Sequence, residues 1–178
     1  MTLAQAEIEN LLPICEIRAP SADDAVAVHD LIGACPPLDT NSLYANLLQC
    51  THFAQTCALA RDKEGILAWV SGYLPPDQPD TYFLWQVAAH PRARGRGVAK
   101  RLITEILRRD VCAGVRQLQT TITADNAASW RLFEAVADTL GAPLRGEMFF
   151  ERKRHFADRH DSEFLVTIGP IPRPLPAR

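Results

Sequence analysis

The chain has 178 residues, enough for one globular domain with its own core and with little room for a second. Hydrophobic residues make up 47% and charged residues 22% of the sequence, which excludes a disordered, collagen-like or coiled-coil protein. The net charge of −2 argues against a surface built for nucleic acid, and no stretch approaches the roughly 20 consecutive apolar residues of a membrane span.

The N-terminal stretch has no basic residue ahead of its apolar part, so it does not resemble a signal peptide and we expect a cytoplasmic protein. The cysteines are odd in number and form no C-x-x-C pair, which favours buried reduced thiols over disulfides or a zinc site. The five histidines show no metal-ligand spacing, and we expect no bound metal. The cysteines are Cys15, Cys35, Cys50, Cys57 and Cys112.

Three segments are expected along the chain. Residues 1–12 are predicted to be a flexible lead-in, and residues 13–168 a single domain. From Gly169 the sequence GPIPRPLPAR has proline at every second position, and proline can neither continue a helix nor donate to a strand ladder. Residues 169–178 are therefore predicted to be an extended, flexible tail.

The first half of the domain alternates between helical and strand patterns. The expected elements are strands over 14–18, 53–61, 66–74 and 81–89 and helices over about 21–33 and 42–50. The side chains expected on the apolar sides of these helices are Ala22, Val26 and Leu31 in the first and Leu43, Leu47 and Leu48 in the second.

In the second half, apolar residues recur at helical spacing from Val98 to Leu107 and predict a helix. Asp125 or Asn126 is expected to cap another helix, which Gly141 ends. The remaining expected elements are strands over 117–123, 144–151 and 163–168. The order of elements predicts an α/β (α+β) fold with a mixed sheet and helices on its faces.

Gly95 and Gly97 lie between the predicted strand over 81–89 and the helix that starts at Val98. Such a junction exposes unpaired backbone N–H groups at the positive end of the helix dipole, and glycines let a bulky anion approach the backbone. No acidic residue occurs between positions 81 and 104, so the junction predicts an anion site. The basic residues around it are Arg92, Arg94, Arg96, Lys100 and Arg101.

Two better-known phosphate loops do not fit this junction. A Walker loop needs G-K-[ST] after its glycines, and a dinucleotide fingerprint needs a small residue where this chain has Lys100. A glycine turn followed by a solvated, basic helix start is the plainer alternative. The density of arginines favours the anion site.

Two motifs resemble those of the GNAT superfamily of N-acetyltransferases. RGRGVA at 94–99 resembles the acyl-CoA motif R/Q-x-x-G-x-G/A, and NAASWRLF at 126–133 resembles N-x-x-[AS]-x-x-L-[YF]. The resemblance covers about residues 14–168. More narrowly, the stretches that closely resemble the L-2,4-diaminobutyrate acetyltransferase family of ectoine biosynthesis are 38–53, 70–91, 120–129 and 155–163.

The superfamily resemblance implies the GNAT fold, a central mixed, mostly antiparallel twisted sheet flanked by helices. It implies a bulge in the strand over 81–89 and a V-shaped gap between the two central parallel strands, where acetyl-CoA binds as co-substrate. The strand backbone would pair with the pantetheine arm and the glycine turn would hold the pyrophosphate. The cofactor-binding residues implied are Val87, Ala88, Arg92, Arg94, Gly95, Arg96, Gly97, Val98, Ala99, Asn126, Ser129 and Phe133.

The narrower resemblance implies a substrate pocket made of Asp39, Tyr44, Trp85, His160 and Glu163. A diamino acid needs acidic partners for its ammonium groups and an aromatic wall. Glu163 is the expected general base, His160 orients it or binds substrate, and Tyr44 is a candidate general acid. The plainer alternatives are turn or cap chemistry for Asp39, a helix–sheet seam for Tyr44, core packing for Trp85, and solvated surface for His160 and Glu163.

The sequence departs from the family pattern at two places. Phe133 stands where many GNAT enzymes have a tyrosine acid, so the acid lies elsewhere or the thiolate leaves unassisted. The family usually has H-E-D-E where this chain has H-D-S-E at 160–163, which leaves the role of Ser162 open while Glu163 is retained.

The resemblance implies direct attack of a deprotonated amine on acetyl-CoA, with the 4-amino group of L-2,4-diaminobutyrate acetylated and the product passed to ring closure to the osmolyte ectoine. Small GNAT enzymes often pair, so a homodimer is expected, with no nucleic acid or membrane partner. The alternatives are a GNAT enzyme for another small amine or a protein N-terminus, a non-catalytic CoA-binding module, and a nucleic-acid binder that uses the basic loop.

Overall fold

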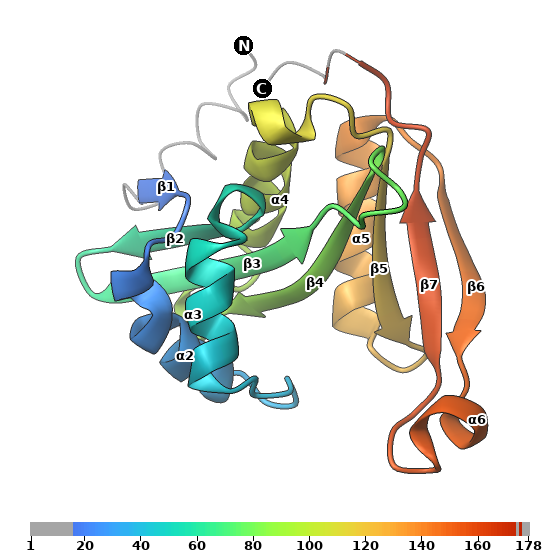
Figure 1. Cartoon of the computed structure of the whole chain (residues 1–178), viewed down its shortest axis with the longest axis horizontal. Coiled ribbons are helices and arrows are strands. Elements are labelled where there is room, and N and C mark those ends of the chain that lie inside the picture. The colour runs from blue at the N-terminus through green and yellow to red at the C-terminus, as the bar shows by residue number, and fades with distance from the viewer. Residues whose placement is uncertain (1–15, 174, 176–178) are drawn as a thin grey trace.

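The structure, a computed structural model, describes residues 16–173 and 175. Its centre is a seven-stranded sheet in the order β1-β2-β3-β4-β5-β7-β6 (Figure 1). Every neighbouring pair is antiparallel except β4 and β5, so the predicted mixed, mostly antiparallel sheet is confirmed. The strands are β1 (Glu16–Arg18), β2 (Ala58–Asp62), β3 (Gly65–Tyr73), β4 (Thr81–Ala89), β5 (Gln117–Thr123), β6 (Leu144–Phe150) and β7 (Glu163–Ile168).

Helices cover both faces of this sheet, with α2 and α3 on one face and α4 and α5 on the other (Figure 1). The α-helices are α2 (Ala25–Gly33), α3 (Leu43–Thr51), α4 (Val98–Arg108), α5 (Ala127–Leu140) and α6 (Arg152–Phe156). Short 3₁₀ turns occur at Ala22–Asp24, Ala54–Thr56, Pro91–Ala93 and Asp110–Cys112. No helix of the described residues is long and apolar enough to cross a bilayer.

The strand β4 carries the bulge that the resemblance implied. Opposite Ser71 and Gly72 of β3 lie Gln86 and Leu84, so Trp85 is the extra residue. On its other edge β4 pairs with β5 only through Thr81–Phe83, and beyond Phe83 no strand of the described chain pairs with that edge. The two parallel strands therefore diverge and leave backbone N–H and C=O groups of β4 facing the gap.

The capping of α5 settles one open alternative. Asn126 Oδ1 accepts a hydrogen bond from the Ser129 N–H at 3.1 Å, so Asn126 is the N-cap. Asp125 instead accepts from the Thr123 hydroxyl at 2.7 Å. At the other end Gly141 has φ 62°, a left-handed conformation that glycine adopts without strain.

Two helices orient their side chains differently from the sequence prediction. In α2 Leu31 is buried as predicted, together with Ala25 and Val28, whereas Val26 is 58% exposed. Ala22, in the 3₁₀ turn before α2, is exposed as well. In α3 the leucine side faces outward, with Leu43 40% exposed, and the buried side is polar. Asn46 Nδ2 donates to Gln49 Oε1 there, which satisfies part of this buried polar side, whereas Gln49 Nε2 is buried without a hydrogen-bond partner in the described chain.

The beginning of the C-terminal tail is anchored rather than loose. Ile171 is fully buried in the main core, and its N–H donates to the Arg116 carbonyl. The Arg173 guanidinium donates to the carbonyls of Leu107, Cys112 and Val115 at 2.8–3.1 Å. Helix C-termini leave carbonyls without partners, and this guanidinium supplies donors to them. The expected lead-in over 1–12 lies outside the described residues.

The four described cysteines are buried, free thiols, as expected, and Cys15 lies outside the described residues. Burial raises the pKa of Cys57 to about 12 and those of Cys50 and Cys112 to about 11. These thiols are therefore protonated at neutral pH and unreactive, because the thiolate is the nucleophile.

Asp24 should make stability depend on acid pH. The Arg18 guanidinium, which donates to both Asp24 carboxylate oxygens at 2.7 Å, lowers the pKa of Asp24 to about 2. Because the folded pKa is below the unfolded value, this stabilisation is present above about pH 4 and is lost as pH falls towards 2. The expected loss is about 2 kcal/mol, measured by urea unfolding between pH 6 and pH 2. An Asp24→Asn variant should be less stable at pH 6 and lose less on acidification; an equal loss would contradict this assignment.

Candidate active site

The glycine turn between β4 and α4 has the geometry of an anion site. Gly95 and Gly97 both have φ 71°, and Gly97 is the left-handed N-cap of α4 with no side-chain cap of its own. The first N–H groups of α4 are consequently left for another acceptor, at the positive end of the helix dipole. Val98 is buried and fixes the helix start to the core, while both glycines are exposed.

The arginines of this turn have different surroundings. Arg92 Nη1 lies 2.9 Å from Asp62 Oδ2 and 3.1 Å from Glu64 Oε2, so it ties the turn to the β2–β3 hairpin and lowers the pKa of Asp62. Arg94 Nε donates to the Ala89 carbonyl and Arg96 Nη1 to the Arg92 carbonyl. The turn is thus ordered by its own side chains.

The other expected cofactor residues lie on β4 and at the start or within the body of α5. Val87 and Ala88 follow the bulge on β4, where the β5 side has no paired strand in the described chain. Asn126 and Ser129 form the N-cap of α5. The Phe133 ring is 3% exposed in the core and has no acidic proton, so it cannot serve as the general acid.

A cavity of about 620 Å³ lies on the sheet face that α2 and α3 also cover. Its size is that of a typical small-molecule site. Aromatic side chains dominate its walls, with amide and hydroxyl groups from β5 between them. The lining residues are Phe53, Tyr73, Pro75, Gln78, Phe83, Trp85, Gln119, Thr121, Phe149, Phe150 and Leu165.

Of the predicted substrate residues, Trp85 is among the residues that line this cavity. The bulge residue Trp85 is 51% exposed and lines the cavity, which argues against simple core packing. Its neighbour Gln86 donates through Nε2 to the Asp39 carbonyl at 2.9 Å and accepts from Asn41 Nδ2 at 3.2 Å. Tyr44 is 69% exposed on the first turn of α3, so it covers no buried seam.

Gln86 and Asn41 were missed by the sequence analysis, because no local pattern marks a contact between positions 45 residues apart. Replacing Gln86 with leucine removes both hydrogen bonds that hold the loop carrying Asp39. Each is worth about 1 kcal/mol. The expected result is a KM for the amine substrate about fivefold to tenfold higher, with CoA affinity unchanged in calorimetry. Asn41→Ala removes one of these two hydrogen bonds and should raise KM by a smaller factor. An unchanged KM in both variants would show that Gln86 does not hold the Asp39 loop for substrate binding.

His160 and Glu163, which the structure brings together, are not among the lining residues, but Glu163 pairs with the lining residue Phe150 across β6 and β7. His160 Nε2 lies 3.9 Å from Glu163 Oε1, and the exposed fractions of the two side chains are 39% and 17%. Glu163 starts β7, paired with Thr123 of β5 on one side and Phe150 of β6 on the other. None of the contacts in the described chain joins this pair directly to Asp39, Tyr44 or Trp85.

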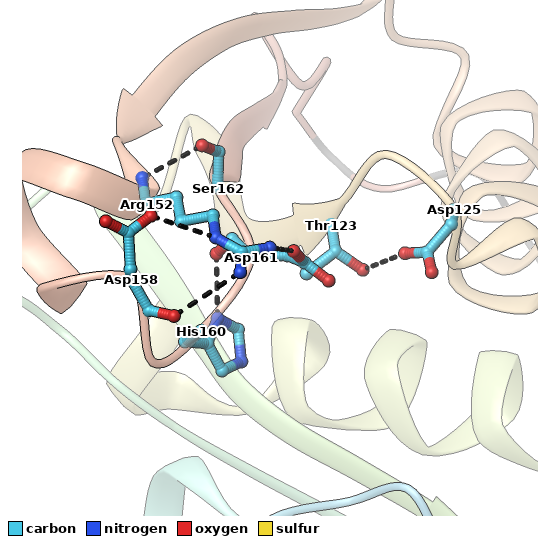
Figure 2. A network of polar contacts seen from close by, with 7 residues as sticks. All are labelled: Thr123, Asp125, Arg152, Asp158, His160, Asp161 and Ser162. Atoms are coloured by element: carbon cyan, nitrogen blue, oxygen red, sulfur yellow. Dashed lines mark hydrogen bonds and ion pairs between the residues drawn. The ribbon is translucent and has the colours of Figure 1, made fainter.

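The question about Ser162 has a structural answer. The Arg152 N–H, at the start of α6, donates to Ser162 Oγ at 2.9 Å (Figure 2). A carboxylate at this position could accept the same bond, which explains why serine and aspartate are both compatible with it. No group of three or more His, Cys, Asp or Glu side chains in the described chain is placed to hold a metal.

Comparison with known proteins agrees with this geometry. The model of the acetyltransferase (GNAT) family matches residues 25–137. The chain is 46% identical to the L-2,4-diaminobutyric acid acetyltransferase of Methylotuvimicrobium alcaliphilum over 160 aligned residues. The aligned stretch covers 90% of this chain and 93% of that protein. The chain is 51% identical over 156 residues to the enzyme of the same name from Chromohalobacter salexigens, covering 87% and 81%.

Solved structures give the same result. A diaminobutyrate acetyltransferase from Paenibacillus lautus, in complex with its substrate L-2,4-diaminobutyric acid and coenzyme A, aligns with TM-score 0.84 and 33% identity over 91% of this chain and 98% of that one. The ribosomal-protein-S18-alanine N-acetyltransferase of Escherichia coli, 16% identical with TM-score 0.63, shares the fold. The chain belongs to the acetyltransferase (GNAT) family and, within it, to the L-2,4-diaminobutyric acid acetyltransferases.

Proposed function

We propose that this protein transfers the acetyl group of acetyl-CoA to the 4-amino group of L-2,4-diaminobutyrate. The observation that carries the proposal is the divergence of β4 from β5 at the Trp85 bulge. The gap has the anion-binding turn of α4 at one end and, on the other sheet face, the cavity that Trp85 lines and beside which Glu163 pairs with the lining residue Phe150. A long, phosphate-headed thioester and a short amine can therefore meet within it.

In this proposal, the cofactor is held mainly by backbone. Residues of the turn from Arg94 to Ala99 donate N–H groups to the pyrophosphate, with Arg94 and Arg96 adding positive charge. The backbone of Val87 and Ala88 pairs with the pantetheine arm, which takes the place of a neighbouring strand. Asn126 and Ser129 border the gap from the start of α5, whereas Phe133 is buried in the core and is left out of the cofactor site. Arg92 does not bind the cofactor itself; its ion pairs with Asp62 and Glu64 of the β2–β3 hairpin hold the turn in place.

Glu163 acts as the general base in the proposed reaction. A side-chain amine has a pKa near 10.4, so only about one in 2,500 molecules is neutral at pH 7, a cost of about 4.6 kcal/mol. Glu163 takes the ammonium proton directly or through a water, and His160 beside it orients the carboxylate. The neutral amine attacks the thioester carbonyl, a backbone N–H at the bulge binds the oxyanion, and the thiolate leaves with a proton. Tyr44 remains the candidate donor of that proton.

Substrate recognition combines a charged and an aromatic side chain. Asp39 binds an ammonium group of the diamino acid, and Trp85 forms the aromatic wall. The acetylated product keeps its 2-amino group, which can condense with the new amide carbonyl and lose water. A cyclase of ectoine synthesis is the reaction class that would consume this product in the cytoplasm.

A homodimer is also part of this proposal. The edge strand β6 is exposed over Arg145–Phe150 on both faces, including Met148, Phe149 and Phe150. An exposed, apolar edge strand pairs readily with a second copy of itself, and a two-fold axis makes the contact self-complementary. Light scattering after size exclusion is expected to show a dimer for the wild-type protein and monomers for Phe149→Lys. A monomeric wild-type protein would contradict the homodimer proposal.

The decisive experiment measures thiol release from acetyl-CoA by the purified protein. L-2,4-Diaminobutyrate is compared with ornithine, lysine, putrescine and a peptide with a free N-terminus, and NMR of the product locates the acetyl group. Saturable release with diaminobutyrate, and much less with the longer diamines, is expected. Release only with another amine would overturn the substrate, and CoA binding without any release would overturn the enzymatic assignment.

A further inference from the structure

The segment between β6 and β7 folds into a compact loop around one arginine. It contains the five-residue helix α6 and then two consecutive residues with positive φ, Ala157 at 50° and Asp158 at 63°. Such conformations are strained for residues other than glycine, and they persist only where surrounding contacts hold them. The contacts that hold this loop therefore determine where His160 lies.

Arg152 supplies most of those contacts (Figure 2). Its Nη1 lies 2.8 Å from Asp161 Oδ1, and its Nε lies 3.2 Å from Asp158 Oδ1. Its Nη2 donates to the Asp158 carbonyl at 3.4 Å, and its backbone N–H donates to Ser162 Oγ at 2.9 Å. One residue at the start of the loop thus contacts the strained turn and both residues that precede Glu163.

His160 is in contact with Asp161, which Arg152 holds, and with the helix α6. Its Nδ1 lies 2.8 Å from the Asp161 carbonyl oxygen, and its ring lies 4.7 Å from the Phe156 ring of α6. Its other nitrogen, Nε2, faces Glu163 Oε1 at 3.9 Å. The fork-shaped guanidinium can bond several acceptors in one plane, which a lysine ammonium cannot reproduce.

We propose that Arg152 is a positioning residue, which sets the His160–Glu163 pair by holding the loop over 157–162 in its strained conformation. This inference rests on the proposed function. Exposed ion pairs contribute little to the stability of a folded protein, and the Arg152 side chain is 53% exposed. Its effect should therefore appear in catalysis far more than in unfolding.

The test compares Arg152→Gln with Arg154→Gln. Arg154 lies on the same helix, is 75% exposed and has only a 4.0 Å contact to Glu151, so it matches the charge change without touching the loop. We expect Arg152→Gln to lower kcat/KM for diaminobutyrate about tenfold, with CoA affinity unchanged and the melting temperature lowered by less than about 3 °C. Arg154→Gln should behave as wild type. Wild-type kinetics in Arg152→Gln, or equal losses in both variants, would overturn the proposal.

Two further measurements separate positioning from a general structural effect. Arg152→Lys should recover only part of the activity and keeps the test valid if the glutamine variant does not fold. Adding Arg152→Gln to a His160→Gln variant should lower kcat/KM only a little further, because both substitutions act on the same His160–Glu163 pair. Fully additive losses of kcat/KM would contradict the inference.

The ring signals of His160 in NMR give a readout that needs no substrate. They should shift in Arg152→Gln and stay in place in Arg154→Gln, and unshifted signals in both would overturn the positioning role. A wild-type enzyme inactive on diaminobutyrate would overturn the proposed function alone, since this spectroscopic result still decides the role of Arg152.

Discussion

Replacing Glu163 with glutamine is expected to lower kcat for acetyl transfer at least tenfold, a modest fraction of the roughly 10²-fold to 10⁴-fold contribution that acid–base catalysis usually supplies. Glutamine keeps the size and the strand position at the start of β7 but cannot accept the ammonium proton. Steady-state kinetics with diaminobutyrate and acetyl-CoA measure the change. The affinity for CoA should stay unchanged in calorimetry, because Glu163 lies at the start of β7, beside Phe150 of β6, and not at the glycine turn.

A pH series strengthens this test. If Glu163 removes the ammonium proton, raising the pH should partly restore the Glu163→Gln variant, because a larger fraction of the amine is then already neutral. Glu134→Gln, at an exposed position of α5, is a matched control and should keep wild-type kinetics. Unchanged turnover in Glu163→Gln would remove this residue from the mechanism.

Replacing Gly97 with glutamate is expected to abolish detectable CoA binding. The new carboxylate would stand at the helix N-terminus that the pyrophosphate occupies in the proposed complex, so that like charges repel. Space does not oppose the substitution, since a Cβ at this position meets no atom within 4 Å. Isothermal titration with CoA should show a loss of at least about 100-fold, from the combined loss of charge-assisted hydrogen bonds.

Two controls separate charge from backbone strain at Gly97. Gly97→Asn places a neutral residue that tolerates φ 71°, so most of the CoA affinity should remain. Gly114→Glu adds the same charge at another open glycine, outside the turn, and should bind CoA normally. Normal affinity in Gly97→Glu would refute the assignment of this turn as the phosphate site.

The strands next to the site were predictable from local sequence, whereas one helix orientation was not. The expected ranges 81–89 and 117–123 coincide with β4 and β5, because runs of β-branched and aromatic residues bounded by turn signals are strong local indicators. The outward orientation of the leucines of α3 could not be predicted from local sequence. Its inward side is polar because Asn46 Oδ1 accepts a hydrogen bond from His29 Nδ1 of α2 at 2.9 Å, a contact between two helices.

The candidate site was partly predictable for the same reason. The glycine turn and the pair His160 and Glu163 lie in contiguous motifs; the structure places the turn at the start of α4 and His160 Nε2 3.9 Å from Glu163 Oε1. The loop contacts of Gln86 and Arg152 are tertiary, and α6 is too short to show helical periodicity. Such supporting residues become visible only once the chain is folded.

The single extra residue in β4 reverses the parity of the strand. Before Trp85, even-numbered Tyr82 and Leu84 belong to the core cluster under α4. After it, even-numbered Ala88 belongs to the cluster under α2, while odd-numbered Val87 packs against the first. An unbulged strand would send Gln86 to the wrong side of the sheet. One inserted residue therefore both opens the gap to β5 and directs the next amide to the loop that carries Asp39.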